Sequence, residues 1–304
     1  MTGTDAIFDE RLHGAAQAVQ ALLTALLSPA ALPDETARPE RLMAAMRHGV
    51  LNGGKRLRPF LVLETARLFD GPEAAALRVA AALECIHCYS LVHDDLPAMD
   101  DDDLRRGQPT VHKAFDEATA ILAGDALLTY AFDIVSDDAT ELPAEAKVAL
   151  VLKLARASGL GGMVGGQMLD LQAEKQTPDE VGILTLQAMK TGALIRFACE
   201  AGPVLAGASR EDASRLAEFG RKIGLAFQLA DDLLDLTADS ATLGKAAGKD
   251  AIKGKGTLPA LHGIDWTRAR LAELVEEAEV LLSPYGEKAD VLKAAARFVA
   301  NRKN

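Results

Sequence analysis

The chain has 304 residues, of which 49% are hydrophobic and 25% charged, and its formal net charge is −11. This composition excludes a disordered or fibrous protein, and the acidic balance argues against a general nucleic-acid binder, which would carry a basic face. Three cysteines, an odd number, argue against a disulfide framework and suit a reducing compartment, so we expect a cytoplasmic protein. We see no signal-peptide pattern, and charges interrupt the long apolar runs, so no transmembrane segment is expected.

Apolar residues recur three and four positions apart along most of the chain, which is the spacing of helices. Gly71-Pro72, Pro143 and Pro178 break the pattern between segments. Several segments are apolar on most faces, as helices in the middle of a helical protein are. With no linker or internal repeat, we expect a single all-α domain over residues 1–304. The periodic segments are Ala16–Leu27, Glu73–His93, Ala144–Ala157, Asp179–Leu205, Asp212–Leu236 and Thr267–Leu282.

The first acidic cluster runs from Asp94 to Asp103, directly after a strongly apolar helix that Pro97 stops. A solvated helix end is the ordinary interpretation of such a run. Here it fits poorly, because carboxylates at a helix C-terminus face the negative end of the helix dipole and repel one another. A site that holds divalent cations would remove this cost.

The second acidic cluster is Asp231-Asp232-Leu233-Leu234-Asp235. Asp231 and Asp235 are four apart and project from one helix face, with Gln228 one turn earlier. Carboxylates in so apolar a helix are costly to bury unless a cation or a basic partner meets them. Ligation by a few carboxylate oxygens suits Mg²⁺, which usually shares the phosphates of a substrate.

A phosphorylated ligand requires basic groups, and the chain carries several. The segment Gly53–Pro59 (Gly-Gly-Lys-Arg-Leu-Arg-Pro) opens a predicted helix, where backbone N–H groups and cationic side chains can bind an anion together. Each basic group alone is ordinary surface charge, but with two acidic clusters they predict a cleft for two metal-bound diphosphates. The other basic groups are Arg105 and Arg106, Lys190, and the glycine-interleaved Lys245, Lys249, Lys253 and Lys255, which resemble a lid.

These motifs, in this order, resemble those of the trans-isoprenyl diphosphate synthases, and specifically the bacterial farnesyl diphosphate synthases. The resemblance covers about residue 40 to residue 300. Besides the segments above, it rests on Gly165-Gly166-Gln167, on Lys190-Thr191, and on the two-residue insertion within Asp94, Asp95 and Asp100. The chain departs from the family at Leu258, where relatives often carry Tyr.

The resemblance implies a helical bundle of the isoprenoid synthase type around a deep central cavity, usually a homodimer. It implies a head-to-tail 1′-4 condensation of isopentenyl diphosphate with dimethylallyl or geranyl diphosphate, giving farnesyl diphosphate and pyrophosphate with three Mg²⁺ ions. By position, the metal ligands would be Asp94, Asp95, Asp100, Asp231 and Asp235, and the allylic diphosphate ligands Arg105, Lys190 and Lys245, with Lys255 near the lid. Isopentenyl diphosphate would meet Lys55, Arg58, His87 and Arg106 beside Gly54 and Arg56, while Thr191 and Gln228 would line the region where charge develops.

Product length is expected to depend on the turn of helix before Asp94, which points into the cavity where the product grows. Tyr89, followed by Ser90, resembles the bacterial C15 pattern, in which a bulky side chain floors the pocket. We therefore favour farnesyl over geranylgeranyl diphosphate, although Tyr89 as an ordinary core aromatic is the alternative.

Three other functions compete with the synthase. A class I terpene cyclase would not need Lys55, Arg56 and Arg58 as a second anion site. A helical metal phosphohydrolase leaves the second acidic cluster unexplained, and an inactive partner subunit would have damaged motifs. Two further features have structural interpretations: Cys85 and Cys88 as buried free thiols, and the glycines of 159–166 as a place of close helix approach.

Overall fold

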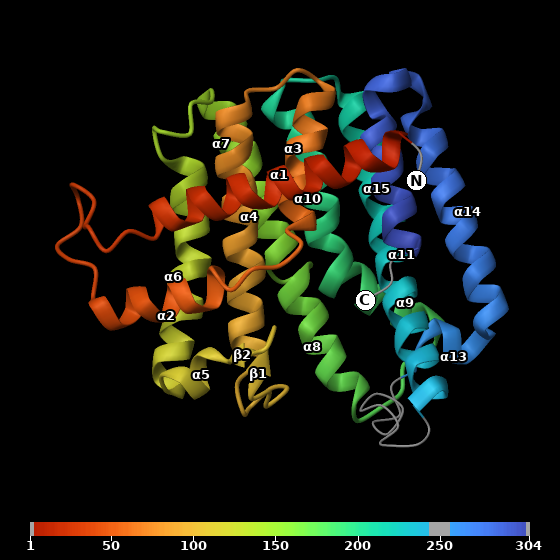
Figure 1. The fold of residues 1–304 in the computed structure, drawn as a ribbon, viewed down its shortest axis with the longest axis horizontal. Coiled ribbons are helices and arrows are strands. Elements are labelled where there is room, and N and C mark those ends of the chain that lie inside the picture. The colour runs from red at the N-terminus through yellow and green to blue at the C-terminus, as the bar shows by residue number, and fades with distance from the viewer. Residues whose placement is uncertain (1–2, 243–255, 302–304) are drawn as a thin grey trace.

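The computed structural model describes residues 3–242 and 256–301, and this part of the chain is almost entirely helical (Figure 1). The expected all-α fold is confirmed. The helices are α1 (Gly3–Leu26), α2 (Glu40–Val50), α3 (Leu57–Leu68), α4 (Glu73–Asp94), α5 (Val111–Ala114), α6 (Glu117–Ser136), α7 (Ala144–Ser158), α8 (Met163–Ala173), α9 (Glu180–Gln187), α10 (Ala193–Leu205), α11 (Arg210–Thr242), α13 (Leu258–His262), α14 (Ile264–Leu282) and α15 (Asp290–Asn301).

Two irregular helical segments complete this part of the chain. A π-helical turn, Ala188–Gly192, joins α9 to α10, so that the segment expected as one helix over Asp179–Leu205 is interrupted near its middle. A 3₁₀ segment, Ser283–Ala289, joins α14 to α15. Both interruptions matter for position, because each changes the direction in which the following side chains project.

A small antiparallel hairpin, β1 (Leu104–Arg105) and β2 (Gln108–Pro109), was not expected from the sequence. Its turn residues, Arg106 and Gly107, both have positive φ, 53° and 76°. That is the turn geometry whose twist matches two short antiparallel strands. The hairpin follows the first acidic cluster directly and aims its two arginines.

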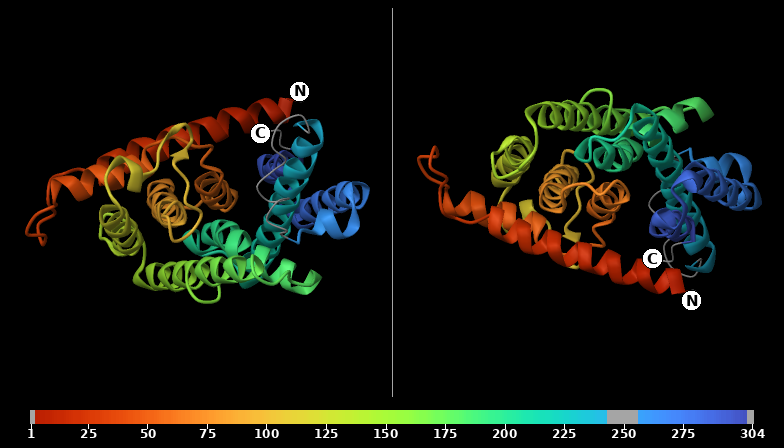
Figure 2. Two further views of the ribbon diagram at one scale, coloured as in Figure 1. Left: turned by 90° about the horizontal axis from the view of Figure 1, so that it is seen from below. Right: turned by 90° about the horizontal axis from the view of Figure 1, so that it is seen from above.

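The central element is α4, which Figure 2 shows nearly end-on beside α3, both in orange and surrounded by other helices. It packs against α3, α6, α1, α2 and α10. Alanines occupy much of its length, and small side chains allow the neighbouring helices to approach closely. The helix ends at Asp94, three residues before Pro97, so the fold places the first acidic cluster at the end of its most enclosed helix.

Three stretches are long and apolar enough, by length and composition alone, to cross a membrane: Glu73–Asp94, Glu117–Ser136 and Ala144–Ala173. Charges do lie within each of these stretches, Arg78 and Glu84 in the first among them, but they are too few to exclude a membrane span by composition. In the first, packing accounts for the apolar composition, since 72% of its apolar window is buried inside the protein. The corresponding share is 39% for Glu117–Ser136 and 28% for Ala144–Ala173, so part of their apolar surface faces outward.

The two ends of the described chain meet through aromatic side chains. Phe8 of α1 lies 5.1 Å from Phe298 of α15 and 5.4 Å from Phe60 of α3, measured between ring centroids. Such contacts add to the burial of apolar area. The contact fixes α15 beside the start of α3, where the basic Gly53–Pro59 segment lies.

Helices α3 and α10 cross closely at Gly202. A Cβ atom at this position would lie 2.2 Å from the carbonyl carbon of Thr65 and 2.5 Å from the nitrogen of Ala66. Because these are backbone atoms, a side chain could be accommodated only if the helices moved apart.

We therefore expect Gly202→Ala to lower the free energy of unfolding by about 1–3 kcal/mol, as measured by urea denaturation. The matched control is Gly14→Ala, on an exposed face of α1 with nothing within 4 Å of the added atom. That substitution should raise stability by about 0.5–1 kcal/mol, because alanine is the better helix former. Equal effects of the two substitutions would contradict the close crossing.

Candidate active site

The two acidic clusters lie toward the same end of the molecule, the lower end in Figure 1, where α4 and α11 finish. After α4, the chain turns back on itself: the amide of Asp100 donates to the carbonyl of Asp94 at 2.8 Å. The turn also contains Asp101 with a positive φ of 52°. This fold of the loop brings the residues on either side of the two-residue insertion, Asp94 and Asp100, together.

Asp95 and Arg105 form an ion pair. From the sequence, Asp95 was expected to bind metal and Arg105 to bind the allylic diphosphate. Nε of Arg105 donates to Oδ1 of Asp95 at 2.7 Å, and only 3% of the surface of Asp95 is exposed. Burial raises the pKa of Asp95, and the hydrogen bond from Arg105 opposes that rise. The pair joins the hairpin to the end of α4, so the position of the Arg105 guanidinium at the site is fixed.

Asp94 is the most strongly perturbed carboxyl of the first cluster. Burial raises its pKa to about 6, while the charge of Lys190 opposes the rise and that of Asp100 adds to it. The influence of Lys190 shows that the site is made from two parts of the chain, since this lysine belongs to the π-helical turn after α9.

The π-helical turn sets the direction of Lys190 and Thr191. It packs against α8 at Gly166, where a Cβ atom would lie 2.2 Å from the backbone nitrogen of Lys190. Nζ of Lys190 donates to Oδ2 of Asp170 on α8 at 2.6 Å. The expectation that the glycines of 159–166 permit close approach is confirmed for Gly165 and Gly166, which contact Met189 and Lys190. π-Turns inside helices often occur at functional sites.

A pocket of about 220 Å³ surrounds the second acidic cluster, and we call it the carboxylate pocket. Its wall includes Gln228, whose Oε1 accepts a hydrogen bond from the Thr191 hydroxyl at 3.0 Å. Hydroxyl and amide therefore hold each other in place at the wall. The residues that line the carboxylate pocket include Asp170, Lys190, Thr191, Gln228, Asp231, Asp232 and Asp235.

Asp232 is a member of this pocket to which the sequence analysis gave no role. It accepts hydrogen bonds from Nε2 of Gln187 at 2.8 Å and from Nε2 of Gln228 at 3.0 Å. Burial raises its pKa to about 6, against these two hydrogen bonds. The sequence analysis grouped Gln228 with Asp231 and Asp235, yet the four-residue spacing from Gln228 to Asp232 was the available signal.

A second pocket, of about 160 Å³, gathers the residues expected to meet isopentenyl diphosphate, and we call it the basic pocket. His87 on its wall has a pKa well below the ordinary value, first because of burial and then because of the charge of Arg58, Arg106, Arg56 and Arg105. The imidazole is therefore neutral at physiological pH. The residues that line the basic pocket include Lys55, Arg56, Arg58, Glu84, His87, Arg106, Phe227 and Phe298.

Gly54, next to Lys55 of the basic pocket, has a backbone conformation that favours glycine. The glycine has a φ of 119°, and a Cβ atom there would lie 2.7 Å from the guanidinium carbon of Arg106. Arg106 also donates to the carbonyl oxygen of Gly53. Phe298, which sequence reasoning missed, lies 5.8 Å from Nζ of Lys55, measured to the ring centroid. Only tertiary contact brings α15 there.

The two pockets are neighbours along one helix. Phe227 lines the basic pocket and Gln228, the next residue of α11, lines the carboxylate pocket. Successive positions of a helix project about 100° apart, so the two pockets lie beside adjacent faces of α11.

The donor set suits a hard divalent cation that shares its coordination with a ligand. Among the residues that the structure describes, no three or more His, Cys, Asp or Glu side chains converge as a metal site. Burial is the main cause that raises the pKa of Asp94 and of Asp232 to about 6, and the charge of neighbouring aspartates adds to each rise. Mg²⁺ needs only one or two carboxylates when phosphates supply the other oxygens. Lys245 and Lys255 lie outside the described residues.

Tyr89 lies one turn and a residue before Asp94 on α4 and is buried, with 5% of its surface exposed. Its ring packs edge-on against His93, 5.8 Å away, and His93 in turn fits over Gly124, where a Cβ atom would be 2.0 Å from the imidazole. Burial raises the pKa of Tyr89 to about 12. Ser90 is half-buried and donates to the carbonyl of His87 at 2.9 Å.

The free thiols are where the sequence placed them. Cys85, Cys88 and Cys199 are all unpaired and buried. Burial raises the pKa of Cys88 to about 12, so this thiol is neutral and unreactive.

Comparison with known proteins gives one consistent family. The family described as polyprenyl synthetase matches residues 39–295. The farnesyl diphosphate synthase of Escherichia coli (strain K12) is 47% identical over 266 residues, which is 86% of this chain and 89% of that one. Geranylgeranyl pyrophosphate synthase 9 of Arabidopsis thaliana is 43% identical, over 88% of this chain and 76% of its own. The apo structure of an FPP/GFPP synthase from Zymomonas mobilis superposes with a TM-score of 0.87 at 43% identity, covering 97% of this chain and 99% of that one.

The raised pKa of Asp94 makes a prediction about stability without metal. Above pH 6 the buried carboxyl is ionised, and this lowers the free energy of unfolding. The destabilisation becomes smaller as the pH is lowered from 6, and it vanishes below the ordinary pKa of 3.8. We expect Asp94→Asn to stabilise the metal-free protein by about 1–2 kcal/mol at pH 7.5 and by roughly half as much at pH 5.

Urea denaturation after EDTA treatment, at both pH values, measures this difference. Asp9→Asn, an exposed position on α1, is the control and should change neither value. A destabilising effect of Asp94→Asn at pH 7.5 would contradict the electrostatic account.

Proposed function

The chain belongs to the polyprenyl synthetase family, and we propose that it is a farnesyl diphosphate synthase, which joins isopentenyl diphosphate to dimethylallyl or geranyl diphosphate. The observation that carries this proposal is the pair of pockets on adjacent residues of α11. One offers cations and a neutral imidazole to an anion, and the other offers carboxylates beside Lys190. A cyclase or a phosphohydrolase, acting on one phosphorylated substrate, has no use for the basic pocket.

In this proposal the basic pocket binds isopentenyl diphosphate. Lys55, Arg58 and Arg106 supply positive charge, and neutral His87 supplies a hydrogen bond. The allylic diphosphate takes the carboxylate pocket, with Lys190 and the hairpin's Arg105 as cationic ligands. Lys245, with Lys255 near the lid, completes this set.

We propose that three Mg²⁺ ions would be held jointly by carboxylate oxygens of the protein and by oxygens of the allylic diphosphate. The carboxylates are those of Asp94, Asp95, Asp100, Asp231 and Asp235. When bound, these ions would neutralise the charge that develops on the leaving diphosphate. Asp95 would also keep Arg105 in place, as its ion pair with that side chain supports.

The chain's own residues then direct the chemistry. The allylic carbon–oxygen bond breaks, the double bond of isopentenyl diphosphate forms the new carbon–carbon bond, and a proton leaves to the released pyrophosphate. Thr191 and Gln228 line the carboxylate pocket, where their mutual hydrogen bond and that from Gln228 to Asp232 hold both side chains; in this proposal they lie where positive charge develops. Preorganised dipoles of this kind stabilise developing positive charge without reorganisation.

Tyr89 is proposed to set the product length. Its buried ring sits below Asp94 on the same helix, locked by His93 and Gly124. A growing chain that extends from the allylic diphosphate along α4 would meet this ring. A geranylgeranyl diphosphate synthase is the alternative, and the relative of that name in Arabidopsis thaliana keeps it open.

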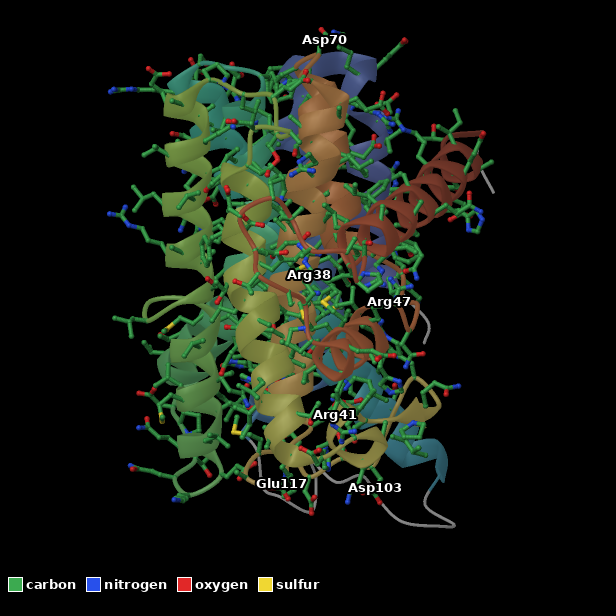
Figure 3. All side chains as sticks on the ribbon, turned by 90° about the vertical axis from the view of Figure 1, so that its left-hand side faces the viewer. Arg38, Arg41, Arg47, Asp70, Asp103 and Glu117 are labelled. Atoms are coloured by element: carbon green, nitrogen blue, oxygen red, sulfur yellow. The ribbon has the colours of Figure 1, made fainter. Side chains whose placement is uncertain are left out.

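We propose that the protein works as a homodimer in the cytoplasm. Apolar side chains on α6 and α7 face outward, among them Leu122, Val148 and Leu152, which are 58%, 67% and 48% exposed. Beside them a groove of about 880 Å³ lies between α6 and the 27–39 segment. Figure 3 looks onto this side of the molecule, where Arg38 and Arg41 lie next to α6. Three free thiols fit a reducing compartment. Sedimentation of the purified protein tests the dimer.

Product analysis tests the proposed reaction. Purified protein with Mg²⁺, labelled isopentenyl diphosphate and geranyl diphosphate is expected to give a dominant C15 alcohol after dephosphorylation, and no elongation after chelation of the metal. A C20 product would support the same reaction with the alternative length. Folded protein that elongates neither dimethylallyl nor geranyl diphosphate would refute the proposal.

Replacing the floor of the pocket tests the length assignment. We expect Tyr89→Ala to shift the main product from C15 to C20 or longer, because the ring no longer limits growth. Tyr285→Ala is the matched control: this tyrosine bonds to Asp212 at 2.7 Å, far along the chain from the site, and its loss should leave the product at C15. An unchanged product from Tyr89→Ala would assign that residue to the core alone.

A further inference from the structure

Arg56 differs from its basic neighbours in where its side chain goes. The sequence analysis placed it beside the diphosphate ligands, but only 4% of its surface is exposed. Its NH2 group donates to the carbonyl of Val50 at 2.5 Å and to Oε1 of Gln20 at 2.9 Å. Its NH1 group donates to Oε1 of Glu84. The guanidinium is therefore fully engaged with α1, α4 and the end of α2.

Glu84 is the charged partner that compensates the buried guanidinium of Arg56. It lies on α4 with 2% of its surface exposed, one turn before His87. A buried carboxylate is costly unless it is paired and hydrogen-bonded, and the same holds for the guanidinium. Removing one partner would leave the other charge buried and uncompensated. The pair thus joins the segment before α3 to the helix that carries His87.

The segment that Arg56 anchors also receives a hydrogen bond from Arg106 at Gly53, and its backbone is unusual at three residues. Gly53, Gly54 and Arg56 all have positive φ, 76°, 119° and 50°. For a residue with a side chain this conformation costs about 1–2 kcal/mol, and it persists only where the surroundings enforce it. For Arg56 the enforcing contacts are the bonds to Glu84, Gln20 and Val50.

Lys55 and Arg58, the basic neighbours of Arg56, line the basic pocket and contact aromatic rings there. Lys55 is exposed and its ammonium lies against the ring of Phe298. Arg58, on the first turn of α3, lies with its guanidinium 5.9 Å from the ring centroid of Phe227. Arg56 also lines this pocket, but its guanidinium is bound to Glu84, Gln20 and Val50. Lys55 and Arg58 therefore lie close in the chain to a side chain that is held in place.

From this geometry we propose that Arg56 and Glu84 are positioning residues for the isopentenyl diphosphate subsite. The pair fixes the 53–58 segment, and through it the positions of Lys55 and Arg58. The charges of Arg56 and Glu84 compensate each other. This inference rests on the proposed function, and it assigns the affinity for one of the two substrates to a buried ion pair.

Steady-state kinetics on Glu84→Gln tests the pair, because this change keeps the shape and removes the charge. We expect KM for isopentenyl diphosphate to rise at least tenfold and KM for geranyl diphosphate to stay within twofold. The control is Glu64→Gln. Glu64 is also buried, 4% exposed, and paired with Arg11 and Arg67, but it does not line either pocket. That variant should lose a similar amount in Tm and keep both KM values.

A double variant separates positioning from stability. Replacing a buried ion pair by apolar residues is often neutral for folding, so Arg56→Met with Glu84→Leu should recover the Tm lost in Glu84→Gln. KM for isopentenyl diphosphate should stay at least tenfold raised, because the loop has lost its bonds to Val50 and Gln20 as well.

Either of two results overturns the inference: a return of that KM to the wild-type value together with Tm, or an equal rise of both KM values in Glu84→Gln. Lack of condensation by the wild-type protein would instead refute the proposed function, so the two failures are distinguishable. Should both variants fail to fold, Glu84→Asp, which keeps the charge but shortens the reach, gives the same readout. We expect an intermediate KM for isopentenyl diphosphate from Glu84→Asp, and wild-type values for both substrates would overturn the inference.

Discussion

Charge buried at and near one end of an apolar helix constrains most of this structure. Helix α4 carries Glu84, His87, Asp94 and Asp95 along the faces that its alanines leave open. Two of these groups are compensated by a partner from elsewhere: Arg56 for Glu84 and Arg105 for Asp95. The left-handed turn before α3 places Arg56 against Glu84, and the hairpin after the first acidic cluster places Arg105 against Asp95. Burial raises the pKa of Asp94 to about 6, although the charge of Lys190 opposes the rise.

The same constraint explains why the site has two pockets and not one. Cations gather where α3 begins and carboxylates gather toward the ends of α4 and α11. Phe227 and Gln228, neighbours on α11, each line one of the two pockets. A condensation needs two anionic ends held apart and two carbon ends held together. Opposite charge preferences in adjacent pockets meet that need, because each diphosphate is drawn to a different set of partners.

Local irregularities supply the fine positions. The π-helical turn that carries Lys190 and Thr191 has one extra residue relative to an α-helix, and it fits against α8 only because residue 166 has no side chain. Asp232 orients the side-chain amides of Gln187 and Gln228, because each of its two carboxylate oxygens accepts a hydrogen bond from one of them. Small departures from regular helix therefore fix side chains that regular helices would aim elsewhere.

The sequence by itself determined the helical class, the helix from Glu73 to the first acidic cluster, and the identity of the motifs, because apolar spacing and charged runs are local patterns. It also indicated which lysine, arginine and histidine meet in the basic pocket, through resemblance to a family. Only the tertiary structure decided that Arg56 turns inward to Glu84, that Asp95 pairs with Arg105, and that Phe298 reaches Lys55. These pairs join residues that are ten or more positions apart, and no local pattern specifies which of several arginines lies opposite a given carboxylate. The outcome depends on which helices pack together, and packing is a property of the whole chain.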